Sequence, residues 1–252
     1  MSDMGGSLSF AAVPSSLGVL GARRKGPQPV WTSARLRGTP RPMSALSPDA
    51  VTALFTRSDD QFLFARWGRP IAPVVFGVTD ETVAVLKGAI EALCLLTSHK
   101  MAETDPELGA NLMVFFIQDW RELTDTPNLD RLIPDLAPLV ARLVAQDANQ
   151  YRIFRFDAQG AIQACFSFIR MDDQLAQVSA ETLALNQMVQ AMLLWSDKAF
   201  HDASPLAMVD GRAVLRPDVA DVMRAAYDPV LPPMSQDPAT AMRLSARLGR
   251  AQ

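Results

Sequence analysis

The chain has 252 residues, 49% hydrophobic and 20% charged, which is enough apolar content to bury a core in one domain or at most two. Residues 1–42 carry six basic residues and one acid, and the remainder carries 18 basic and 26 acidic residues, a net charge of −8. An acidic body argues against nucleic-acid binding, which depends on neutralising phosphates. No apolar run reaches the roughly 20 residues that span a bilayer, so we expect no membrane association.

Residues 1–42 contain Gly, Ser, Pro and Arg without a sustained hydrophobic period, a composition typical of a segment that does not pack. Ser47 and Pro48 then have the pattern of a helix N-cap and first helical residue. We predict that residues 1–42 are a disordered or mis-annotated extension, with Met43 as the initiator, before one α+β domain at residues 43–252. An organelle transit peptide is the alternative. With neither a signal peptide nor an early lipid-bearing cysteine, a cytoplasmic location is expected.

From residue 49 onward, helical and strand patterns alternate, and Pro73 marks its strand as an edge strand. An Asp157–Gly160 turn predicts a hairpin. Together the patterns predict an α+β fold with about five strands in a mostly antiparallel or mixed sheet, packed by helices. Helices are predicted at 49–57, 79–98, 119–123, 129–145 (with breaks at Pro134 and Pro138), 179–200 and 217–227 and within 235–248, and strands at 61–67, 71–78, 111–117, 151–156 and 162–169.

The helix predicted at 179–200 is apolar on almost every side, which indicates a buried helix. Asn186, Gln187 and Gln190 form a narrow polar stripe on it, because residues four apart share a face. They keep the spacing of the zinc-peptidase motif H-E-x-x-H but place an amide at each chemical position. One interpretation is that the stripe faces solvent or forms hydrogen bonds with neighbouring backbone. The other is that it lines a cleft inherited from an enzyme.

Other candidate sites lack a supporting pattern. His99 and His201 each follow a predicted helix, and a catalytic zinc usually takes three protein ligands, so neither a metal nor another cofactor is expected. The loop containing Glu103, Asp105 and Glu107 lacks the ligand spacing of a calcium-binding EF-hand and is expected to be solvated.

Trp67, flanked by two arginines, could stack on a ligand or grip an anion, or be a strand-end aromatic with outward arginines. The sequence has no nucleophile elbow and no Gly-rich phosphate loop. Cys94 and Cys165 fall in apolar segments, where two buried free thiols are more common than one disulfide.

Three places together resemble the proteobacterial domain of unknown function family 2927, many of whose members look like lipoproteins with a zincin-like peptidase fold. They are Arg66-Trp67 with the strand that follows, the strand 165–170 leading into the helix 184–200, and the block 223–234 with its Tyr227-Asp228-Pro229. The resemblance covers residues 48–245. In the family a His-Glu pair stands where this chain has Asn186 and Gln187, so a metal ligand and the general base are both missing.

The resemblance therefore implies a zincin-like domain without the family's chemistry. We expect a pseudoenzyme that binds a protein or peptide partner, with a candidate cleft formed by Asn186, Gln187, Gln190, Trp67 and Tyr227. A hydrolase using non-zincin residues in the same cleft is the alternative. A purely structural subunit is a third possibility, and it would show a large exposed apolar patch.

Overall fold

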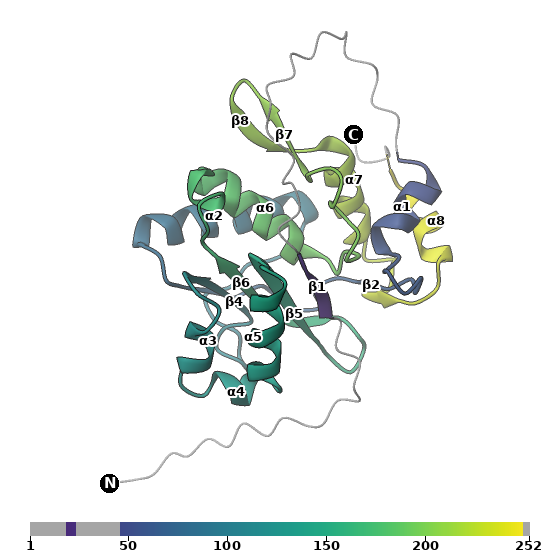
Figure 1. Cartoon of the computed structure of the whole chain (residues 1–252). Coiled ribbons are helices and arrows are strands. Elements are labelled where there is room, and N and C mark those ends of the chain that lie inside the picture. The colour runs from purple at the N-terminus through teal and green to yellow at the C-terminus, as the bar shows by residue number, and fades with distance from the viewer. Residues whose placement is uncertain (1–18, 24–45, 249–252) are drawn as a thin grey trace.

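In a computed structural model, which describes residues 19–23 and 46–248, the chain forms a mixed α and β fold built on a five-stranded sheet (Figure 1). The sheet has the strand order β1 (Val19–Arg23), β5 (Gln150–Phe156), β6 (Ile162–Arg170), β4 (Leu112–Ile117) and β3 (Pro73–Phe76). Strands β3, β4 and β6 are parallel to one another, whereas β1 and β6 both run antiparallel to β5. The sheet is therefore mixed, as the sequence patterns predict.

Helices cover both faces of this sheet (Figure 1). Because successive strand residues point to opposite faces, Leu112 and Val114 of β4 join one core cluster and Ile117 joins another. The first cluster packs against α2 (Asp80–Thr97) and α6 (Ala180–Met192). The second packs against α3 (Glu122–Asp125), α4 (Leu129–Leu132) and α5 (Leu136–Ala145).

Smaller elements extend the first cluster on its outer side (Figure 1). They are α1 (Pro48–Phe55), α7 (Pro217–Ala226), α8 (Ala239–Ser245), the short antiparallel pair β2 (Phe64–Ala65) and β9 (Met234–Ser235), and the hairpin of β7 (Leu206–Val209) and β8 (Arg212–Leu215). Among the residues the structure describes, no helix is long and apolar enough to cross a membrane.

Local sequence signals place several elements correctly. The Ser47 hydroxyl accepts a hydrogen bond from the Ala50 amide at 3.2 Å, and Pro48 begins α1, so the predicted cap is confirmed. Strand β3 is an edge strand, as Pro73 predicts. The β5–β6 hairpin is also confirmed, with Gly160 in the left-handed region at φ 77°.

Two long predictions are wrong in extent. The strand predicted at 61–67 reduces to β2, which pairs with β9 instead of joining the main sheet. The helix predicted to reach Phe200 ends at Met192, and Leu193 has extended backbone (φ −135°, ψ 157°) that forms a bridge to Arg66. Pairing with segments remote in the sequence decides both cases.

The prediction for residues 1–42 is incomplete. Val19–Arg23 forms β1, which extends the sheet beside β5 with Val19 opposite Ile153. Residues 1–18 and 24–42 lie outside the described part of the chain, so the choice between Met1 and Met43 as the first residue stays a prediction.

Both cysteines are buried free thiols, as the sequence predicts. Burial raises the pKa of Cys94 to about 11 and that of Cys165 to about 12, so both stay protonated at neutral pH.

Candidate functional site

The three blocks that carry the family resemblance meet at the C-terminal end of α6. Arg66 forms a backbone bridge with Leu193, and its guanidinium donates to the Leu231 carbonyl at 3.2 Å. Ala65 pairs with Met234 in the β2–β9 ladder. Segments far apart in the chain are therefore joined at one helix end.

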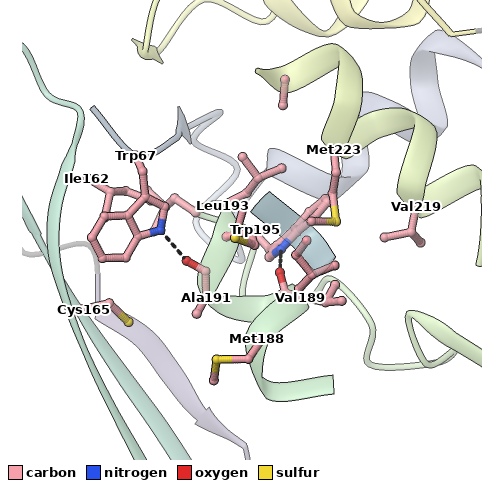
Figure 2. Packing of buried hydrophobic residues seen from close by; sticks show 14 of the residues in the cluster. Trp67, Ile162, Cys165, Met188, Val189, Ala191, Leu193, Trp195, Val219 and Met223 are labelled. Carbon is pink, nitrogen blue, oxygen red and sulfur yellow. Dashed lines mark hydrogen bonds between the residues drawn. The ribbon is translucent and has the colours of Figure 1, made fainter. Parts of the chain in front are cut away.

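Aromatic side chains satisfy the carbonyls of that helix end, which have no partner within the helix itself. Trp195 Nε1 donates to the Val189 carbonyl at 2.9 Å, and Trp67 Nε1 donates to the Ala191 carbonyl at 2.9 Å (Figure 2). The Tyr227 hydroxyl donates to the Met192 carbonyl at 2.7 Å. All three side chains are buried. Trp67 and Tyr227 thus hold the helix end.

The amide stripe faces β5. Gln187 is 0% exposed and Gln190 is 4% exposed. The Arg152 guanidinium donates to Gln190 Oε1 at 3.2 Å and also to Gln187 Oε1. Gln187 Nε2 donates to Gln150 Oε1 at 3.0 Å, and Gln190 Nε2 donates to Asn186 Oδ1. The partner of the stripe is therefore a buried arginine, and neither solvent nor backbone alone accounts for it.

This arrangement opposes metal binding at the stripe. Gln187 and Gln190 occupy the positions of the glutamate and second histidine of H-E-x-x-H, and both amide oxygens already accept from a guanidinium. A divalent cation there would meet a like charge at close range in a desolvated environment. Within the described residues, no group of three His, Cys, Asp or Glu side chains could hold a metal ion.

The candidate residues thus form two groups along one helix. Asn186, Gln187 and Gln190 gather around Arg152, and Trp67 and Tyr227 bind the helix end. Both groups are held by hydrogen bonds within the protein, which leaves little free polar chemistry at either.

His99 lies beside the second group. The half-buried ring follows α2, its Nε2 is 2.9 Å from the Arg69 carbonyl, and its centroid is 5.0 Å from that of Tyr227. The Arg66 guanidinium lies 5.7 Å from the centroid of the Tyr227 ring, as in a cation–π contact. Burial lowers the pKa of His99, the Arg69 carbonyl opposes this change, and the Arg66 charge adds to the lowering. Burial therefore favours the neutral form of His99.

The acidic loop is solvated at Glu103 and Glu107, which are exposed as predicted, but not at Asp105. Asp105 is buried, and its Oδ1 accepts from the amides of Glu107 and Leu108, each at 2.9 Å. Its Oδ2 accepts from Asn111 Nδ2 at 3.0 Å, and Arg69 lies 3.4 Å away. These contacts lower the pKa of Asp105 in spite of its burial. The carboxylate is thus fully engaged in fixing the loop.

Arg152 is the residue that sequence reasoning missed. The feature of the sequence that could have pointed to it is a basic residue within the apolar run Tyr151–Phe154. It lies on the same face of the strand as Gln150. A charged side chain that points into the core needs a polar partner, and the amide side chains of the stripe can accept its hydrogen bonds.

Comparisons with known proteins give no relative. No protein-family model matches this chain, and neither a curated protein nor a solved structure shows significant similarity to it.

Replacing Tyr227 by Phe keeps the ring but leaves the buried Met192 carbonyl without its donor. We expect the free energy of unfolding to fall by about 1–3 kcal/mol, as measured by urea denaturation. Tyr151, the other tyrosine of the chain, accepts a long hydrogen bond of 3.4 Å from Arg142, so Tyr151→Phe should lose less than about 1 kcal/mol. Equal losses in the two variants would show that the helix-end bond does not matter.

The neutral His99 predicts a pH dependence of stability. Its pKa in the folded protein lies below the ordinary value of 6.5, so as pH falls below 6.5 the unfolded chain binds a proton that the folded protein does not. Stability should then decrease toward pH 5, with a slope of at most about 1.4 kcal/mol per pH unit, the limit for one proton.

The other histidine, His201, provides a control for this pH effect. The free energy of unfolding would be measured by urea denaturation between pH 7.5 and 5. His99→Gln should remove the slope, whereas substitution of the exposed His201 by Gln should retain it. A slope that survives in His99→Gln would assign the effect to other groups.

Proposed function

We propose that this chain is a non-catalytic, zincin-like domain that acts by binding a protein or peptide partner. The observation that carries the non-catalytic part is the Arg152 guanidinium, which occupies the oxygens of Gln187 and Gln190. Peptidase chemistry at these positions needs a metal and a carboxylate base, and the chain places a fixed cation and two neutral amides there.

The order of elements supports the zincin-like part of the proposal. A hairpin, β5–β6, leads into the long helix α6, and the block with Tyr227 returns to the end of that helix. This is the order in which the family resemblance places the metal-binding helix and its supporting segment. Kinship with domain of unknown function family 2927 is part of the same proposal.

The β7–β8 hairpin supports the partner-binding part. It projects from the body of the molecule (Figure 1), and Met208, Val209 and Val214 on it are 44%, 52% and 37% exposed. Apolar side chains gathered on a projecting element are typical of an interaction surface.

The hairpin is also held rigidly at its base, where Leu206 is buried. The Arg216 amide donates to the Pro205 carbonyl, and the Arg216 side chain donates to the Ser204 carbonyl, both at 3.0 Å. A preformed surface loses little entropy when it binds.

The hairpin can be tested by photo-crosslinking in cells that make the protein. A benzoylphenylalanine residue placed at Val209 should give a crosslinked band of one defined mass, and the same residue at the exposed Asp125 on α3 should not. Adding Val214→Asp should abolish the band at 209. Identical smears from both positions would contradict a specific partner at the hairpin.

Metal analysis of the purified chain separates this proposal from a hydrolase. We expect far less than one zinc ion per chain, together with no peptide hydrolysis. Zinc at one equivalent, lost together with hydrolytic activity on chelation, would contradict the non-catalytic proposal.

A further inference from the structure

A second candidate site lies on the opposite side of the sheet from α6. A hollow of about 210 Å³ opens between the α4–α5 turn, α5 and β5. Ile133, Leu139 and Ile153 form its apolar wall, and these three side chains are buried. Pockets that enclose a drug-sized molecule measure roughly 300–1,000 Å³, so this hollow fits a small ligand or one end of a larger one.

Three hydrogen-bond donors stand around this apolar wall. Arg155 donates through one nitrogen to the Leu132 carbonyl at 3.0 Å, which leaves its other nitrogens available. Arg142 donates to the Tyr151 hydroxyl at 3.4 Å. Because that hydroxyl oxygen accepts from Arg142, its own hydrogen can be donated to a ligand, and burial raises the pKa of Tyr151 so that the hydrogen stays in place.

The positive charge at the hollow is not balanced by ion pairing. Among the residues the structure describes, no carboxylate lies within ion-pair distance of Arg142 or Arg155, although other arginines, such as Arg69, Arg170 and Arg247, have such partners. Arg155 is also partly desolvated, and this burial lowers its pKa. Arg142 is exposed, whereas the half-buried Arg155 would gain from an anion that pairs with its charge.

The geometry points to a binding site for a carboxylate with an apolar body. The carboxylate would accept from Arg142, Arg155 and the Tyr151 hydroxyl, and the apolar body would cover Ile133, Leu139 and Ile153. A planar guanidinium matches a carboxylate in shape as well as charge. Asp135 also lines the hollow and repels an anion, so it limits the affinity. Such a ligand is either a small free acid or the C-terminal residue of a polypeptide.

The two tyrosines of the chain allow a direct test, since Tyr151 lines the hollow and Tyr227 is buried at the end of α6. In protein labelled with ¹³C-tyrosine, 3-phenylpropionate should shift the Tyr151 signals and leave those of Tyr227 unchanged. The matched alcohol, 3-phenylpropan-1-ol, should bind at least tenfold more weakly. No shift with any acid, or equal binding of acid and alcohol, would overturn the proposal.

The peptide acetyl-Gly-Gly-Leu distinguishes the two sources of the carboxylate. Tenfold tighter binding of its free acid than of 3-phenylpropionate supports a polypeptide C-terminus, and the reverse order supports a small acid. The C-terminal amide of the same peptide should not bind. Binding of the amide at the affinity of the free acid would overturn a carboxylate site.

Substitutions test the individual groups. Arg155→Gln should weaken 3-phenylpropionate binding at least tenfold, while Arg131→Gln, on α4 outside the hollow, should leave it unchanged. Asp135→Asn should tighten binding about threefold by removing the opposing charge, and this result stays informative if Arg155→Gln fails to fold. Unchanged affinity in a folded Arg155→Gln, or weaker binding in Asp135→Asn, would contradict the site.

Discussion

The carbonyl groups at the C-terminal end of α6 impose the constraint on which the rest of the structure depends. A helix that is apolar on nearly every side must lie in the core, and there water cannot satisfy its last carbonyls. Trp67, Trp195 and Tyr227 donate to three of them from different segments of the chain. Each donor also buries a large ring, so one set of residues satisfies polar groups and builds the core.

The same helix brings together segments that are distant in the sequence. Arg66-Trp67, α6 and the block around Tyr227 meet because the helix end needs donors and the neighbouring backbone needs a strand partner. The energetic basis of this framework is hydrogen bonding and burial. The polar stripe then needs only a partner, which Arg152 supplies.

Elements specified by neighbouring residues could be predicted from the sequence. Ser47 and Pro48 fix the start of α1, Gly160 marks the β5–β6 hairpin, and Pro73 marks an edge strand. Asp210-Gly211, with φ of 48° and 78°, is an equally local signal for the β7–β8 hairpin, which the predicted elements do not include.

Features that depend on remote partners could not be predicted. The apolar pattern continues past Met192, and α6 stops there because Leu193 pairs with Arg66. For the candidate site, the sequence identified the amide stripe and both Trp67 and Tyr227, but it gave no means of pairing the stripe with Arg152 across 35 residues. Strand β1 likewise depends on the free edge of β5.

A double-mutant cycle between Arg152 and Gln187 tests most directly whether the stripe exists to hold the buried arginine. Arg152→Met, Gln187→Met and the double variant would be compared with the parent chain by urea denaturation. If the two side chains are partners, each single variant leaves a buried polar group without its bond, and the coupling free energy should be about 1–3 kcal/mol. Strictly additive losses would contradict this role, and Gln187 would again be a candidate for binding a ligand.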